Sequence, residues 1–175
     1  MGRKGQVLIE AVIYILISLA LIGIVLAFAH PKIEEIQDRT IIEQSEEVMQ
    51  DVADTITEIR QGGSGNQRLI EIGIKKGELK IEPANDSIIF EIESSYTYSE
   101  PGKEYLRGDI IVRTKKISDY NLITLKLNYK DLFNITYNGE ESPKTLSKGG
   151  VPYELLFKNL GENEASGLIG IDISL

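Results

Sequence analysis

The chain has no cysteine, and His30 is the single histidine among its 175 residues. Without cysteine, the sequence excludes disulfides, zinc–thiolate sites and cysteine nucleophiles. One histidine also excludes a metal site built from several histidine ligands. We therefore expect a protein that is stabilised by core burial or by assembly, with no metal and no cofactor.

Motifs that carry enzyme chemistry are missing as well. The sequence has no P-loop, no dinucleotide fingerprint and no EF-hand spacing. The glycine-rich run at residues 62–65 follows a predicted helix and does not open one, so it is not placed to bind a phosphate. Paired acids such as Glu140-Glu141 are typical of a solvated surface. We predict that the chain is not an enzyme.

Basic residues are outnumbered, since 19 Lys and Arg stand against 27 Asp and Glu and the formal charge is −8. A protein that binds nucleic acid needs basic side chains for the phosphate backbone. We therefore expect no nucleic-acid partner. An acidic body is compatible with a solvent-facing surface outside the cytoplasm.

One long stretch, residues 11–29, contains no charged side chain. As a helix it would measure about 28 Å at ~1.5 Å per residue, close to the roughly 30 Å of a bilayer core. Arg3 and Lys4 precede it and Glu34 and Glu35 follow it. The positive-inside rule then predicts a single-pass membrane protein with a cytoplasmic N-terminus and an outer C-terminal part.

The apolar stretch is longer than the core of an ordinary secretory signal. Ala27-Phe28-Ala29 is similar to a signal-peptidase site, but His30-Pro31 beside the bond disfavours cleavage there. We therefore expect the helix to be retained.

An acid, Glu10, stands at the edge of this stretch. A carboxylate in lipid is costly, so it indicates a function. The plainer interpretation is an acid in the first helical turn, where the helix dipole stabilises it in the headgroup region.

The order Arg3-Lys4-Gly5, then Gln6, then Glu10, then the apolar run resembles an archaeal type IV pilin precursor with a class III signal peptide. The resemblance covers residues 2–30, with Leu8 where many such precursors have serine. It implies that a class III prepilin peptidase cuts between Gly5 and Gln6, and that the apolar helix is kept.

The resemblance also implies a structural role. Glu10 of one subunit would face the new Gln6 ammonium of its neighbour and set the axial register, because leaving either charge alone in an apolar bundle is unfavourable. The partners would be copies of the chain in a helical filament, the peptidase, an assembly ATPase and a membrane platform protein. The filament would lie on the cell surface and serve adhesion or attachment.

Residues 31–61 have isoleucines spaced by three and four with acids between them, which predicts an amphipathic helix. The glycines that follow Gln61 end it. Pro31 removes a helical hydrogen bond, so we expect a kink or local melting near residues 28–31, either as a plain hinge or as the place where the helix loosens on assembly.

The period shortens toward two in the remaining chain, residues 66–175. We expect an antiparallel, sandwich-like β head packed on the helix, in an α+β fold. Lys75-Lys76-Gly77 is typical of a hairpin turn. The predicted strands cover residues 68–74, 78–82, 87–93, 96–98, 109–114, 122–129, 133–137, 153–158 and 168–175.

Two sequons, at Asn85 and Asn134, would accept N-glycans outside the cell. Tyr96, Tyr98, Tyr105 and Tyr120 either form an adhesive surface or simply follow the preference of aromatic residues for strands.

The sequence thus predicts four parts: a cleaved leader at residues 1–5, an apolar helix at 6–30, an amphipathic helix at 31–61 and the β head. The alternatives are a membrane-anchored β-domain accessory protein that never polymerises, and an archaellin or minor pilin.

Overall fold

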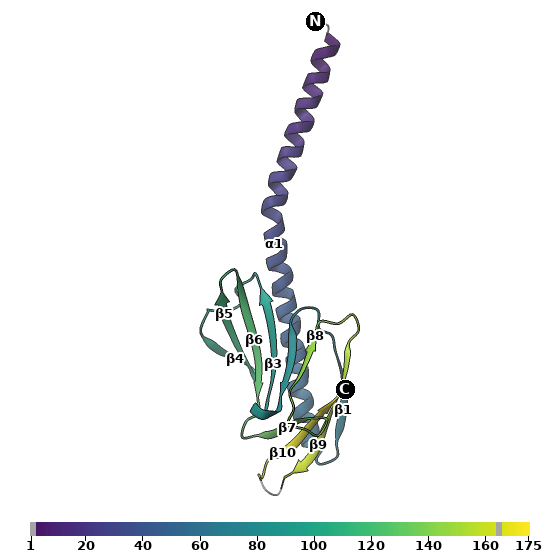
Figure 1. Cartoon of the computed structure of the whole chain (residues 1–175), viewed down its shortest axis with the longest axis vertical. Coiled ribbons are helices and arrows are strands. Elements are labelled where there is room, and N and C mark those ends of the chain that lie inside the picture. Colours follow the sequence, from purple (N-terminus) through teal and green to yellow (C-terminus); the bar gives the residue numbers. More distant parts are fainter. Residues whose placement is uncertain (1–2, 164–165) are drawn as a thin grey trace. The chain divides into compact units, whose positions relative to one another are not determined.

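The structure is a computed structural model that describes residues 3–163 and 166–175, with side chains from Val7 onward. The chain divides into two compact units, Met1–Gln37 and Asp38–Leu175. Helix α1 (Arg3–Gln61) contributes to both units and is followed by ten strands and one short 3-10 helix (Figure 1). The strands are β1 (Gln67–Ile72), β2 (Glu78–Glu82), β3 (Ser87–Ser94), β4 (Glu104–Arg107), β5 (Ile110–Ile117), β6 (Tyr120–Asn128), β7 (Phe133–Tyr137), β8 (Lys144–Ser147), β9 (Tyr153–Glu162) and β10 (Ile169–Ser174), and the 3-10 helix is η1 (Pro83–Asn85).

In the first unit, every described residue is helical. In the second unit, α1 has an apolar face that repeats every three or four residues, as an amphipathic helix requires. The large apolar side chains on this face are fully buried: Ile42, Met49, Val52, Ile56 and Ile59. The helix ends where the Gly62 amide donates to the Glu58 carbonyl and Gly63 takes a positive φ of 79°. A glycine in this conformation is a common helix stop.

Two sheets form the rest of the second unit. One has four strands in the order β1-β9-β10-β7, and the other has six in the order β4-β5-β6-β3-β2-β8. Neighbouring strands run antiparallel, except that β10 and β7 are parallel. The α+β fold predicted from the sequence, a long helix followed by a largely antiparallel β head, is confirmed.

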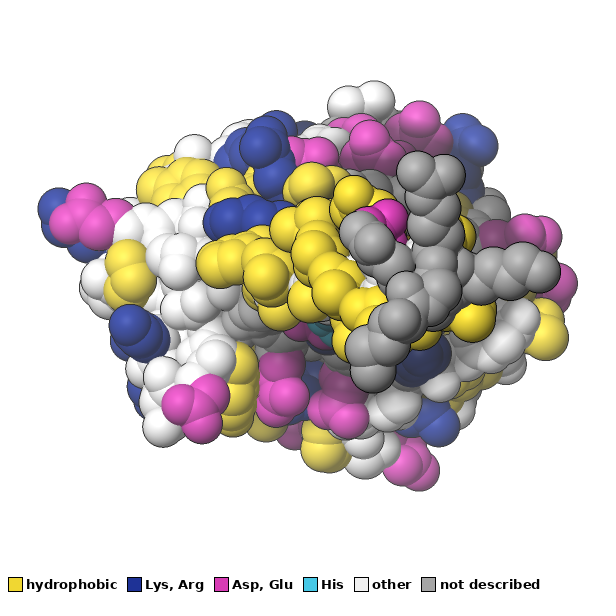
Figure 2. Space-filling view, turned by 90° about the horizontal axis from the view of Figure 1, so that it is seen from above, with side chains coloured by type: hydrophobic (Ala, Val, Ile, Leu, Met, Phe, Trp, Pro, Cys, Tyr) yellow, Lys and Arg dark blue, Asp and Glu magenta, His cyan; other side chains and the backbone are white. Residues whose placement is uncertain are grey.

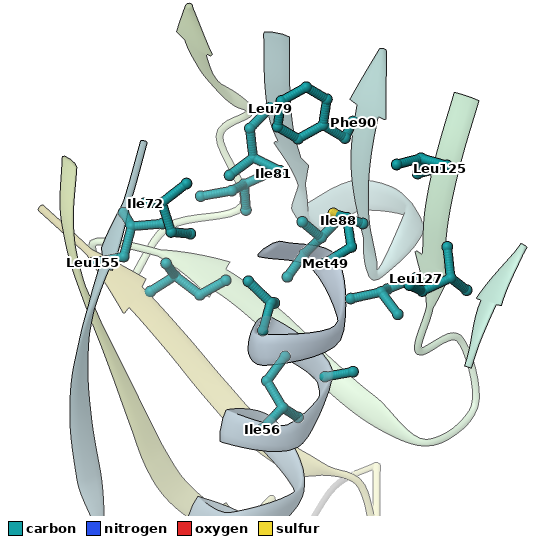
Figure 3. Packing of buried hydrophobic residues seen from close by; sticks show 14 of the residues in the cluster. Met49, Ile56, Ile72, Leu79, Ile81, Ile88, Phe90, Leu125, Leu127 and Leu155 are labelled. Atoms are coloured by element: carbon teal, nitrogen blue, oxygen red, sulfur yellow. The ribbon is translucent and has the colours of Figure 1, made fainter. Parts of the chain in front are cut away.

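The hydrophobic core surrounds the buried face of α1 (Figure 3). Met49 and Ile56 project from the helix, with Ile72 and Leu155 of the four-stranded sheet on one side. Phe90, Leu125 and Leu127 of the six-stranded sheet lie on another side. Both sheets therefore use the helix as a common apolar partner.

The predicted hairpin at residues 75–77 is wrong. β1 pairs with β9 and β2 pairs with β3 and β8, so the chain changes sheets at this point. Gly77 is still required there, because its φ is 89° and a Cβ would lie 2.3 Å from the Glu91 carbonyl oxygen. The local signal for a turn was sound, but alternation alone does not tell which sheet the next strand joins.

Residues 96–98 were expected to form a strand and do not, while strands β4 and β8 were not predicted. The tyrosines gave residues 96–98 a β-like composition. Both unpredicted strands have four residues and lie at sheet edges, where one neighbour supplies the pairing and the sequence pattern is weak.

Candidate functional site

The apolar part of α1 is the most unusual surface of the first unit. Its large apolar side chains from Val7 to Phe28 are 48% to 75% exposed. Seen from above, hydrophobic side chains gather near the centre of the molecule, with most charged side chains around them (Figure 2). This helix is long and apolar enough to cross a membrane: its most apolar stretch has a mean hydropathy of 2.9, and none of that stretch is buried. Such a surface needs lipid or other apolar helices around it.

Glu10 lies on this part of α1, and its side chain is exposed. Gly5 and Gln6, between which we predict cleavage, have helical backbone but lie outside the residues whose side chains are described. Glu10 is thus placed on the exposed apolar surface of the helix. The cleavage site and the pairing with a Gln6 amine stay predictions.

Pro31 lies inside α1, and the helical assignment continues through residues 28–31. We expected either local melting or a kink near residues 28–31. The helix is not locally melted there, and a kink at Pro31 stays a prediction. Polar contacts flank the proline, since His30 Nδ1 lies 3.3 Å from Glu34 and Lys32 pairs with Glu35 at 2.7 Å. Polar side chains of this kind suit the place where an apolar helix leaves a membrane.

The two sequons differ in accessibility. Asn85 is exposed at the end of η1, but the hydroxyl-bearing residue of its sequon, Ser87, is fully buried. Asn134 is half-buried on β7, and Thr136 donates to Asp172 at 2.7 Å. In the folded head neither sequon is wholly exposed, and modification at Asn85 or Asn134 stays a prediction.

Asp38, at the start of the second unit, ties α1 to the sheets. Its carboxylate accepts from Lys76 Nζ at 2.5 Å and from the amide and hydroxyl of Ser95 at 2.7 and 3.0 Å. Burial opposes ionisation, but the ammonium and the hydrogen bonds outweigh it, so the pKa of Asp38 lies below its ordinary value. The charged form of Asp38 therefore stabilises the fold.

Glu46 lies two turns further along α1, and its pKa is shifted in the opposite direction to that of Asp38. Arg107 Nη1 of β4 contacts Glu46 Oε2 and also lies 2.7 Å from the Tyr98 hydroxyl. The other carboxylate oxygen, Oε1, is buried and has no hydrogen-bond partner among the described residues. Burial raises the pKa of Glu46, and Tyr98 and Arg107 oppose this only in part. The charged form of Glu46 is thus less well accommodated than that of Asp38.

Sequence reasoning missed both of these clusters. Their partners are separated by 38 to 61 residues in the chain. No local spacing reveals such pairs. The one available hint was that acids stood at the helical positions Asp38 and Glu46, four residues before and after the buried Ile42.

The four tyrosines do not form one exposed patch. Tyr96 and Tyr98 are half-buried, with ring centroids 6.4 Å apart in an edge-to-face arrangement. Tyr105 and Tyr120 are 37% and 36% exposed. The first two support the packing of the head, which favours the strand-composition interpretation over an adhesive surface for them.

Comparisons with protein-family models, curated proteins and solved structures return no match. Among the residues that the structure describes, no group of three or more His, Asp or Glu side chains is placed to hold a metal ion. The site that stands out is therefore the apolar, exposed surface of α1 together with Glu10.

Proposed function

We propose that the chain is a structural subunit of an archaeal type IV pilus-like surface filament. In this proposal it enters the membrane as a single-pass precursor, loses residues 1–5, and assembles through α1 with its β head outside. Adhesion or attachment to surfaces would follow from the filament. The observation that carries the proposal is the coincidence of Glu10 with a helix whose large apolar side chains are exposed from Val7 to Phe28.

The exposed helix supports assembly because an apolar surface of this size is not stable in water. Lipid covers it before assembly, and neighbouring helices would cover it in a filament. Lipid tails are as apolar as leucine, so moving the helix from membrane to filament gains little from the hydrophobic effect itself. Packing, specific polar pairs and head contacts would then decide whether subunits polymerise.

Glu10 supports a register between subunits. In the proposed mechanism, cleavage after Gly5 creates an ammonium on Gln6, four residues before the carboxylate. Within one subunit, these charges lie at the same end of the helix. Between subunits, Glu10 of one helix would meet the amine of another, and each unpaired charge in the apolar core would oppose any other register.

A substitution of Glu10 tests this proposal. Cells that produce Glu10→Ala should process and insert the protein normally but fail to incorporate it into filaments, which can be imaged and analysed for this chain. Glu34→Ala is the matched control, because Glu34 is an exposed acid of the same helix beyond the apolar stretch. It should assemble as the wild type does.

Filaments that contain Glu10→Ala at the wild-type level would contradict the register mechanism. If the wild-type chain is found in the membrane and in no filament, the whole proposal fails. The protein would then be a membrane-anchored β-domain accessory protein that does not polymerise.

A further inference from the structure

A groove runs along one side of α1 in the second unit. Two adjoining hollows, of about 470 and 290 Å³, share Val48 and Asp51 in their linings. The helix forms one wall, and β1 with the segment after it forms the other. β1 is the edge strand of its sheet, and Val48 and Ile70 form a half-buried apolar floor.

The rim of this groove is acidic. Glu47, Asp51, Asp54 and Glu58 follow one another along a single face of α1, and Glu71 lies across from them on β1. Glu58 pairs with Arg68, whereas Glu47, Asp51 and Glu71 form no ion pair within the described part of the chain. Like charges one helical turn apart cost about 0.2–0.5 kcal/mol per pair. Lys75 also lines the groove, where it donates to Gln44 at 2.9 Å and pairs with none of these acids in the described part of the chain.

A second surface of the same head has the opposite charge. It is the outer face of β4, β5 and β6, where the side chains alternate with buried ones such as Val112 and Leu125. Arg113, Lys115 and Lys126 point outward, and neither lysine forms an ion pair within the described residues. Glu104 pairs with Arg113, so this acid does not offset the positive charges of Lys115 and Lys126.

Apolar side chains accompany these basic groups. Leu106 on β4 is 73% exposed and stands opposite Ile111 of β5, which in turn stands opposite Lys126 of β6. Leu122 stands opposite Lys115. The acids Glu91 and Glu93 lie one strand further on, and Glu91 is held by Lys80 at 2.7 Å. We call the β4–β6 surface the basic face.

The two surfaces match in chemistry: one has an apolar floor with an acidic rim, and the other has apolar side chains among unpaired lysines. We propose that the basic face of one copy docks onto the acidic groove of a second copy in the filament. This inference rests on the proposed function, because it assigns the head contact of the filament. It commits to a second copy of this chain as the occupant of the groove.

The proposed contact joins two different surfaces. A contact of this kind leaves one unused groove and one unused basic face on every pair, so further copies can add at both ends. The copies form an open helical filament when the rotation between neighbouring copies does not close a ring. A contact through two identical surfaces would stop at a dimer. The head would therefore add directionality to the polymer that α1 forms.

Cysteine crosslinking tests the contact directly, because the full chain has no cysteine of its own. The full-length variant Asp51→Cys/Lys126→Cys, treated with a short bismaleimide in purified filaments, should give a ladder of trimers and longer species. Each single-cysteine variant should give at most background. The matched control is Asp51→Cys/Lys158→Cys, since Lys158 is an exposed lysine in the middle of β9, on the other sheet.

The outcomes separate the two proposals. A ladder with Lys126→Cys and none with Lys158→Cys supports the contact. Filaments that give no ladder, or equal ladders for both pairs, overturn it and leave the proposed function in place. Absence of the chain from filaments refutes the proposed function, and the head contact with it.

Charge exchange gives an independent test. Asp51→Lys and Lys115→Glu should each lower filament yield by about five- to tenfold, since each replaces an attraction with a repulsion. Combined in one chain, they should restore most of the yield, because the swapped charges again face each other. Lys158→Glu should leave the yield unchanged. A double variant no better than either single variant, with its head as stable as the wild type, would contradict the contact.

Discussion

The two halves of α1 both contain many isoleucines, but these side chains are exposed in the first half and mostly buried in the second. Ile17 in the first unit is 50% exposed, whereas Ile56 in the second unit is fully buried. The first half has apolar residues on all sides, and the second half keeps them to one face with acids on the other. A helix that is apolar all round must find apolar surroundings outside its own domain, while an amphipathic helix is satisfied by its own sheets.

The largest expected effect comes from truncating the buried half. Ile56→Ala should lower the free energy of unfolding of the head by about 2–5 kcal/mol, because it removes apolar contacts and leaves a cavity between two sheets. Chemical denaturation of the full chain in detergent, followed by tyrosine fluorescence, would measure this loss. Seven of the eight tyrosines lie in the second unit, so the signal reports on the head.

Ile17→Ala is the matched control from the exposed half. It should leave the unfolding of the head unchanged, since Ile17 lies in the other unit. Equal destabilisation by Ile17→Ala and Ile56→Ala would contradict the division of α1 into an anchor and a core helix.

The next largest effect concerns Asp38, where the second unit begins. Asp38→Asn should cost about 1–3 kcal/mol, because Lys76 and Ser95 lose the charged acceptor that they share. Thermal unfolding at neutral pH would measure this cost. Lys76→Met should cost less, because the Ser95 bonds remain; a larger loss for Lys76→Met would contradict the account.

The same cluster predicts a dependence on pH. The folded pKa of Asp38 lies below its unfolded value, so its stabilisation is present above the unfolded pKa and is lost as the pH falls through the folded pKa. The stability difference between wild type and Asp38→Asn should therefore shrink below about pH 4. A difference that stays constant down to pH 2 would show that the charge of Asp38 is not the cause.

The smallest change in stability should come from substituting Glu46, and it should be a gain where the substitution of Asp38 gives a loss. Because burial raises the pKa of Glu46, its charged form is disfavoured in the fold and its contribution falls as the pH rises above the unfolded pKa. Glu46→Gln should stabilise the head at neutral pH by about 0.5 kcal/mol. Denaturant unfolding at pH 4 and pH 7 would check it, and a loss of stability at pH 7 would show that the Arg107 pair outweighs burial.

Periodicity predicted much of the fold, but not how the strands pair. The helical spacing of Ile42, Met49, Val52 and Ile56, at intervals of seven, three and four residues, indicated the buried helix face. Alternation indicated most of the strands. Sheet membership was not predictable, because the alternation that marks Ile72 and Leu79 as buried is the same in both sheets. The placement of the helix between two sheets is a tertiary property that no window of sequence contains.

The candidate site could be predicted only where it consists of local sequence features. Glu10 and the apolar run are local features that the sequence alone reveals, and both are exposed in the structure. Arg107 and Lys76 reach α1 from strands and loops far along the chain, so only the folded head reveals them. The acidic groove and the basic face also need strand order before their residues come together.

We propose that the exposed half of α1 is a filament helix that is freed when a short leader is cleaved. The N-terminal sequence of the mature protein, isolated from cells that make it, tests this claim most directly. The account predicts a chain that begins at Gln6. A mature protein that still begins at Met1 or Gly2 would contradict it.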